Sequence, residues 1–168
     1  PGTSFDIGDV TVDTFSVPHD AQDPIGFVLH TSDGNVGFLT DLGHATKLVI
    51  ERVRCANVLV LETNHDIKLL QDDLHRPWSV KQRILSRHGH LCNEAAAEVA
   101  QKIVTDQLRQ IYLGHRSRDC NRPELAVRAV SAKLDQVGAK HVRIASTTQD
   151  RPSSPLYLGR PFLPTTLA

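Results

Sequence analysis

Apolar and polar positions alternate through the first part of the chain. Between Phe5 and Asp41, β-branched and aromatic residues recur at about every second position, which is the period of half-buried strands. Clusters of glycine, aspartate, asparagine and proline separate these runs and supply the tight turns of hairpins. We therefore predict a group of hairpin-connected strands, which includes strands at 10–17, 25–31 and 36–40.

From residue 45 onward the pattern changes to helical periodicity interrupted by short apolar runs. Apolar spacing and capping residues predict helices at 45–55, 79–87, 93–104 and 123–137. The apolar runs predict short strands at 57–61, 110–114 and 141–145. This alternation of strands and helices is typical of an α/β fold.

Two residues mark predicted helix starts, and one composition change marks the end of the domain. Asn93 is predicted to cap the helix that follows it, and Pro123 suits the first position of the last helix. After Gln149, proline and serine prevail and periodicity is lost. The sequence therefore predicts one domain at 1–149 and an extended tail at 150–168.

Composition limits the classes of function. The chain has 168 residues, of which 40% are hydrophobic, and this suffices for one globular core without disulfides. Its 19 basic and 19 acidic residues balance, so no overall field draws it to a polyanion, although a local basic patch is compatible with this. No apolar run reaches the roughly 20 residues that a bilayer-spanning helix needs, so we expect no membrane partner.

The sulfur-containing residues bear on the compartment and on the start of the chain. The three cysteines are an odd number without CxxC spacing, which argues against a disulfide framework and a structural zinc knuckle. We expect a reducing, cytoplasmic setting. Methionine is absent and the chain starts at Pro1, which favours a truncated or cleaved product.

Polar residues follow four of the predicted strands. They are His19 and Asp20, Asp41, Glu62 and His65, and His115. In open α/β sheets, the loops at the carboxyl ends of strands aim side chains at a common point. Imidazole nitrogens and carboxylate oxygens suit zinc, manganese or iron, and a carboxylate can bridge two ions. The sequence therefore suggests a metal site, and hydrogen-bonded loop histidines are the alternative.

A further histidine, His90, directly precedes a predicted helix. A pair of metal ions can hold a hydroxide nucleophile at neutral pH, so a hydrolase of this kind needs little beyond a proton donor for the leaving group. His90 is our first candidate for that donor. In the alternative interpretation, His90 and Asn93 only cap the helix.

Six short segments resemble the C-terminal part of the WalJ/YycJ-type metallo-β-lactamase-fold hydrolases in order and spacing, over roughly residues 4–145. The segments are 16–27 (SVPHDAQDPIGF), 40–43 (TDLG), 61–66 (LETNHD), 89–94 (GHLCNE), 113–117 (LGHRS) and 121–126 (NRPELA). This family is related to the RNase Z and RNase J groups, whose members cleave phosphodiesters, and its own branch is associated with exonuclease action on DNA. The resemblance implies a four-layer αββα sandwich and nucleic acid as substrate.

The resemblance also implies roles for individual residues. The family's two-metal site consists of an HxHxDH loop, a downstream histidine, a bridging aspartate and a final histidine. The last three correspond to His19, Asp41 and His115. His90 resembles the RNase Z-type histidine that assists the leaving group, and Glu62 is the candidate for its acidic partner. Further candidate site residues are Asp20, His65 and Asn93, and His65 has the alternative role of fixing its loop.

One feature of the family is missing from the chain: no HxHxDH motif occurs in it. We therefore expect a C-terminal portion of the fold with an incomplete site for two divalent ions, zinc first, and little catalysis by this polypeptide alone. The inner face of its sheet would be uncovered. A missing N-terminal half of the same product, a companion fragment or self-association would cover it.

Two other functions are compatible with the sequence. The same fold could hydrolyse a thioester, a lactone or a β-lactam. Alternatively, the scaffold could be a metal-free, inactive binding module, in which a basic group contacts phosphates. That group consists of Lys81, Arg83, Arg87, Arg116, Arg118 and Arg122.

Overall fold

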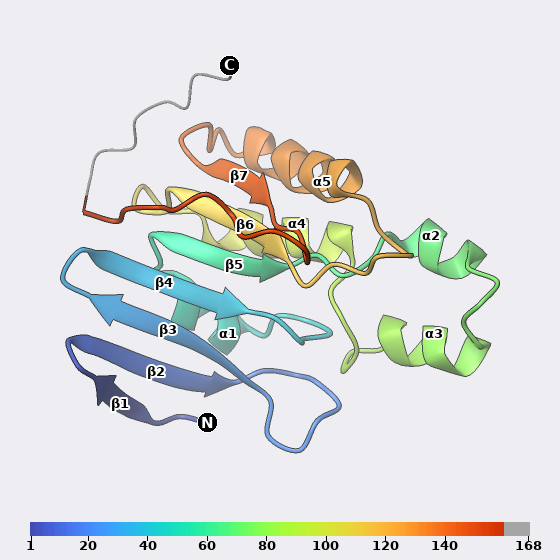
Figure 1. The fold of residues 1–168 in the computed structure, drawn as a ribbon, viewed down its shortest axis with the longest axis horizontal. Coiled ribbons are helices and arrows are strands. Elements are labelled where there is room, and N and C mark those ends of the chain that lie inside the picture. The colour runs from blue at the N-terminus through green and yellow to red at the C-terminus, as the bar shows by residue number, and fades with distance from the viewer. Residues whose placement is uncertain (160–168) are drawn as a thin grey trace.

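Seven strands form one mixed sheet in residues 1–159, the part of the chain that the computed structural model describes (Figure 1). The spatial order of the strands follows the chain order, β1 to β7. The first four strands pair antiparallel, and β4, β5, β6 and β7 pair parallel. The strands are β1 (Ser4–Ile7), β2 (Val10–Ser16), β3 (Ile25–Thr31), β4 (Gly34–Leu39), β5 (Val58–Glu62), β6 (Gln110–Gly114) and β7 (Arg143–Ser146).

The helices lie in the connections between the parallel strands. They are α1 (Lys47–Val53), α2 (Ile67–Asp72), α3 (Trp78–Leu85), α4 (Asn93–Ile103) and α5 (Pro123–Gln136). Figure 1 shows α1, α4 and α5 behind the sheet, and α2 and α3 beyond the carboxyl ends of the parallel strands. The α/β class is confirmed, and the described residues form one helical layer on one sheet.

The hydrophobic core lies between the sheet and the layer of α1, α4 and α5. Alternate residues of β5 and β6 point toward these helices, so Leu59, Leu61, Ile111 and Leu113 are fully buried. The alanine-rich face of α4 packs against α5 and α1, because small side chains let the helices approach closely. This packing holds the carboxyl ends of the parallel strands in a fixed arrangement.

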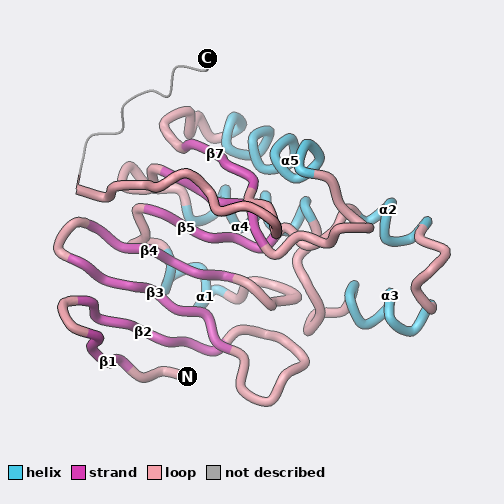
Figure 2. The backbone as a smooth tube through the Cα atoms, viewed as in Figure 1, coloured by secondary structure: helices cyan, strands magenta, loops and turns pink. Residues whose placement is uncertain are grey.

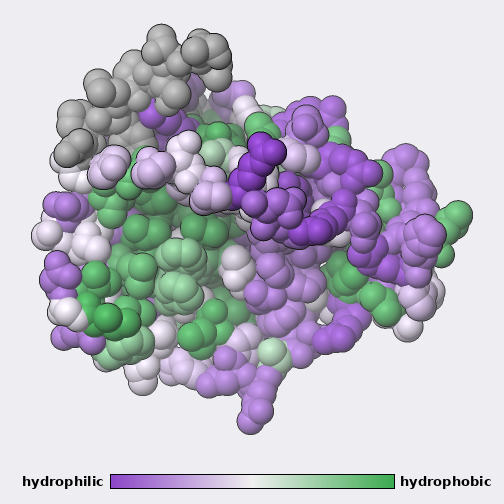
Figure 3. Space-filling view, viewed as in Figure 1, coloured by the Kyte–Doolittle hydropathy of each residue, from purple (hydrophilic) through white to green (hydrophobic). Residues whose placement is uncertain are grey.

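The opposite face of the sheet is apolar, and no helix of residues 1–159 covers it. Strand register places Phe27, Phe38, Val60 and Tyr112 in one row on this face, and the rings of Phe27 and Phe38 stack at 4.7 Å between centroids. Ile25 in the same sheet is 42% exposed. Figure 3 shows apolar residues gathered over the left and centre of this face, with hydrophilic residues at the strand-end edge. The expected uncovered face is therefore present in the described residues.

Local details differ from the expectations in two places. The structure adds the short helix α2, which follows the N-cap Asp66 and which the apolar spacing did not reveal. The cap of α4 was predicted wrongly: it is Cys92, whose sulfur accepts from the Ala95 N–H at 3.4 Å, and Asn93 is the first helical residue. Pro123 is confirmed as the first residue of α5.

Residues 147–159 contain no helix or strand. Residues 160–168 of the predicted tail lie outside the described part of the chain. Segment 147–158 runs back along β6 and β7 (Figure 1). The cysteines Cys55, Cys92 and Cys120 are free. None of the described helices has the length and apolar character to cross a bilayer.

The open face generates a prediction about the 168-residue chain by itself. Replacing Ile25 with glutamate should weaken self-association of this chain about tenfold, because a buried isoleucine contributes about 1.5–3 kcal/mol. Sedimentation velocity measures the association. Leu48→Glu is the matched control, since Leu48 is 57% exposed on α1 at the other face. A strictly monomeric chain that binds no hydrophobic dye would contradict this prediction.

Candidate metal centre

Five of the predicted site residues meet at the carboxyl-end edge of the sheet. His19 follows β2, Asp41 follows β4, Glu62 ends β5, and His115 follows β6. His90 lies in the loop before α4. In Figure 2 these loops gather at the strand-end edge, because β2, β4, β5 and β6 all point the same way.

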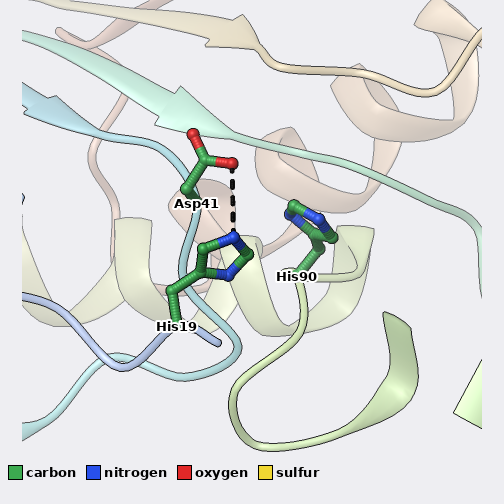
Figure 4. Close-up of side chains that lie close together, drawn as sticks. All are labelled: His19, Asp41 and His90. Carbon is green, nitrogen blue, oxygen red and sulfur yellow. Dashed lines mark ion pairs between the residues drawn. The ribbon is translucent and has the colours of Figure 1, made fainter. Parts of the chain in front are cut away.

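The carboxylate of Asp41 lies between two imidazoles. Its Oδ1 is 3.7 Å from Nε2 of His19 and 3.5 Å from Nε2 of His115. Figure 4 shows the His19 ring pointing toward Asp41, with the His90 ring beside them on a separate loop. The side chains of three residues, each of which follows a different strand, therefore lie close together.

The other nitrogen of each imidazole has an oxygen partner. Nδ1 of His19 lies 2.9 Å from the carbonyl oxygen of Gly89, Nδ1 of His90 lies 2.8 Å from Oε1 of Glu62, and Nδ1 of His115 lies 3.3 Å from Oε2 of Glu62. A proton on Nδ1 makes each of these contacts favourable and leaves Nε2 as the lone-pair donor. This is the arrangement that a metal-ligating histidine needs.

The buried carboxylate of Glu62 contacts several residues of the centre. Its side chain is 0% exposed, and it accepts backbone hydrogen bonds from Asp41, from Leu42 at 3.3 Å and from Leu91 at 3.1 Å. Burial disfavours the charged carboxylate, but hydrogen bonds with His115 and His90 outweigh it and hold the pKa of Glu62 below its ordinary value. In return, the Glu62 carboxylate raises the pKa of His115 against the effect of burial.

Two of the proposed ligands have strained backbones. Asp41 has φ 58° and His115 has φ 50°, and they are the non-glycine residues with positive φ in the described chain. A left-handed conformation of a non-glycine residue costs about 1–3 kcal/mol and occurs preferentially at functional sites. The fold therefore holds these two side chains at the strand ends against a local preference.

Close backbone contacts hold the loops of the centre together. The N–H of Gly43 donates to the carbonyl of Pro18 at 2.9 Å, and the N–H of Asp20 donates to the carbonyl of His88 at 2.9 Å. A Cβ on Gly43 would lie 2.4 Å from the carbonyl carbon and oxygen of Arg87, so only glycine fits there. The loops after β2 and β4 and the loop before α4 are thus packed backbone to backbone.

His90 has two possible roles in this geometry. Ligand atoms of His19, Asp41 and His90 lie within 4.8 Å of one another, and so do those of Glu62, His90 and His115. Its ring centroid is 5.0 Å from that of His19 and 5.3 Å from that of His115. The position suits both a proton donor at the edge of the centre and an additional ligand.

The remaining candidates lie around the centre. Oδ1 of Asp20 lies 3.8 Å from Nε2 of His19, and Oδ2 of Asp20 pairs with Arg83. His65 is 1% exposed and neither ring nitrogen has a partner, and burial lowers its pKa to about 4. Its backbone bridges Cys92. His65 is therefore a neutral, buried residue behind the centre.

Asn93 does not reach the centre. It forms a buried amide pair with Asn121, with N–O distances of 3.0 and 2.8 Å, and Asn121 also donates to the carbonyl of Thr63 at 2.7 Å. Sequence reasoning missed Asn121, although it belongs to one of the segments that carry the resemblance. The pair ties the start of α4 to the loop before α5.

The predicted basic group divides into separate parts. Lys81 is buried and donates to the carbonyl of Gln71 at 2.7 Å, and Arg83 pairs with Asp20. In contrast, Arg116, Arg118 and Arg122 line one cavity of about 720 Å³ that His115 also lines. The arginines next to the centre therefore lie on the side of β6 and α5.

The comparisons with known proteins agree with this geometry. Residues 1–115 match the family model described as the beta-lactamase superfamily domain. The exodeoxyribonuclease YycJ of Bacillus anthracis is 40% identical over 131 residues, which cover 78% of this chain and 49% of that protein. The exodeoxyribonuclease WalJ of Streptococcus pneumoniae (strain D39) is 35% identical over 135 residues, 80% of this chain and 50% of that one. The chain spans about half the length of these curated relatives.

Among solved structures, the metallo-β-lactamase-fold protein YhfI from Bacillus subtilis has a TM-score of 0.64 at 13% identity, over 88% of this chain and 50% of that one. This likeness concerns the fold. Together with the family match over residues 1–115 and the two relatives, it shows that the chain belongs to the β-lactamase superfamily domain family, as a WalJ/YycJ-type protein with the metallo-β-lactamase fold.

Proposed function

We propose that the full-length protein containing this chain is a metal-dependent phosphodiesterase that acts on nucleic acid, with exonuclease action as its expected mode. The observation that carries the proposal is the convergence of His19 and His115 on Asp41, with Nδ1 of each histidine occupied and Nε2 turned inward. The names of the two relatives, both exodeoxyribonucleases, support DNA as the substrate class.

The donor set fits divalent transition metals. Two imidazoles and one carboxylate suit zinc first, and manganese or iron also, whereas magnesium prefers oxygen ligands alone. We propose that His19, Asp41 and His115 would be among the residues that hold two such ions. The family's HxHxDH loop would provide the remaining ligands, from residues beyond this chain.

The chain's own residues provide orientation and a proton. When bound, the ions supply Lewis acidity and lower the pKa of a bound water. We propose that His90 donates a proton from Nε2 to the leaving oxygen, while Glu62 accepts at Nδ1 and fixes the ring. Because Glu62 also contacts His115, one carboxylate positions both the proton donor and a ligand.

The open sheet face fits the same proposal. The two relatives are about twice as long as this chain, and the family fold has a second sheet. We propose that the face with Phe27 and Phe38 packs against that second sheet within the full-length protein, which would also bring the HxHxDH loop to the centre. This arrangement would bury the apolar row that the described residues leave open.

Asp41→Asn tests the metal centre. The substitution keeps the size of the side chain but removes the negative charge that faces both imidazoles. Affinity for zinc should fall by more than the roughly 10–100-fold that loss of an outer contact costs. Isothermal titration calorimetry of the full-length protein measures the affinity, with Asp23→Asn as the exposed control. Unchanged zinc binding in Asp41→Asn would mean that this is not the metal site.

Glu62→Gln tests the positioning carboxylate. Without its charge, the pKa of His115 should fall toward the ordinary histidine value, since the Glu62 carboxylate is the main cause of its rise. Zinc affinity should fall about 10–100-fold. NMR titration of the imidazole in metal-free protein reads the pKa directly, and Glu98→Gln on exposed α4 surface is the control. If the His115 titration were the same in both variants, Glu62 would not control this ring.

His90→Gln separates a proton donor from a ligand. As a donor, His90 should matter for poor leaving groups, so kcat for an oligodeoxynucleotide should fall about 10²–10⁴-fold. Hydrolysis of bis(p-nitrophenyl) phosphate, whose leaving group needs no proton, should change little. His88→Gln is the control, because His88 is exposed two residues away. If His90→Gln lost activity equally on both substrates and also lost zinc, His90 would be a ligand instead. If the wild-type protein were active on acyl substrates alone, it would not be a phosphodiesterase.

A further inference from the structure

A cavity lies beside the candidate metal centre. It measures about 720 Å³, and His115 lines it together with the loop of residues 116–123 and segment 147–150. His115 therefore belongs both to the proposed metal centre and to the cavity wall.

Arg116 is a partly buried guanidinium that forms no ion pair among residues 1–159, although the carboxylate of Glu124 acts on its charge from a distance. Its Nη1 donates to the hydroxyl of Ser146 at 2.6 Å and to the carbonyl of Thr147 at 3.2 Å. No carboxylate lies within 4 Å of it among residues 1–159, and its Nε and Nη2 have no acceptor there. The edge formed by Nε and Nη2 is the fork that binds two oxygens of a phosphate.

Arg122 repeats this arrangement at the start of α5. Its Nη1 donates to backbone carbonyls, including that of Asn121 at 2.7 Å, and no described carboxylate pairs with it. Arg118 pairs with Asp150 at 3.1 Å. The cavity wall thus holds three guanidinium groups and one carboxylate, although the chain as a whole has no net charge.

The backbone adds to this positive character. α5 is 14 residues long, begins at Pro123 in the cavity wall and has no side-chain cap at its N-terminus. Pro123 has no N–H, and the N–H groups of Leu125 and Ala126 already donate to the carbonyl of Arg122, so the helix start contributes through its dipole and not through free donors. A cavity wall with three guanidinium groups and one carboxylate favours an anion such as phosphate over a neutral ligand.

We propose that this cavity binds a non-scissile phosphate of the nucleic-acid strand, through the free edges of Arg116 and Arg122, while the neighbouring phosphodiester occupies the metal centre. This inference rests on the proposed function and adds a substrate-positioning site to it. It explains how a chain without overall positive charge would hold a polyanion: the charge that matters is confined to one wall next to His115.

The test uses Arg116→Gln and Arg122→Gln in the full-length, zinc-loaded protein. Each variant should raise KM for a single-stranded oligodeoxynucleotide about tenfold and reduce the salt dependence of binding by about one contact. Both should hydrolyse bis(p-nitrophenyl) phosphate, which has no neighbouring phosphate, at the wild-type rate. Arg128→Gln is the matched control, since Arg128 lies on α5 but lines a different groove, between α4 and α5.

The outcomes are distinct. Unchanged KM for the oligodeoxynucleotide in Arg122→Gln, at an exposed position, would overturn the phosphate site. Equal losses on both substrates would overturn it as well, because they indicate damage to the centre. Wild-type protein that hydrolyses the small diester but does not bind the oligodeoxynucleotide in fluorescence anisotropy would remove the phosphate site and leave a phosphodiesterase. Hydrolysis of neither would remove the proposed function itself.

Discussion

The structure of the centre depends on one buried carboxylate. Glu62 is fully buried at the end of a central strand, where an unpaired charge would be strongly destabilising. Its oxygens are instead surrounded by backbone N–H groups of the loops after β4 and before α4 and by the imidazoles of His90 and His115. Each of these contacts stabilises the charge, and each in turn fixes the position of a loop. The same interaction therefore stabilises a buried charge and organises the centre.

Much of the fold followed from the sequence because periodicity reflects burial. The run at 57–61 predicted a central strand, and β5 lies between β4 and β6 and is parallel to both. Pro123 predicted a helix start because its ring fixes φ and its missing N–H costs nothing there. In contrast, α2 has six residues and one buried side chain, too few for a periodic signal. Cys92 caps α4 through a sulfur, which residue preferences do not anticipate.

The candidate site shows a similar division. Strand-end position and the family resemblance pointed to His19, Asp41 and His115, and the geometry brings these residues together. The sequence could not show that Asn93 pairs with Asn121, because that depends on how the start of α4 packs against the loop before α5, 28 residues further along the chain. Nor could it show that Lys81 is buried while Arg116 has a free edge. The sequence shows which side chains are charged, but whether a charged side chain already has a partner depends on tertiary contacts.

The two faces of the sheet and its strand-end edge have different structural roles. The helix-covered face is packed with leucine and isoleucine and fixes the strand ends, while the open face leaves an apolar row. The strained backbones of Asp41 and His115 lie at the edge between them. Strain of this kind persists only where surrounding packing determines the conformation. Because the core lies on the helix side, that packing exists within the described residues, and we infer that the candidate centre keeps its shape whatever covers the other face. Under the proposed function, ligands from beyond this chain would then meet side chains that are already in position.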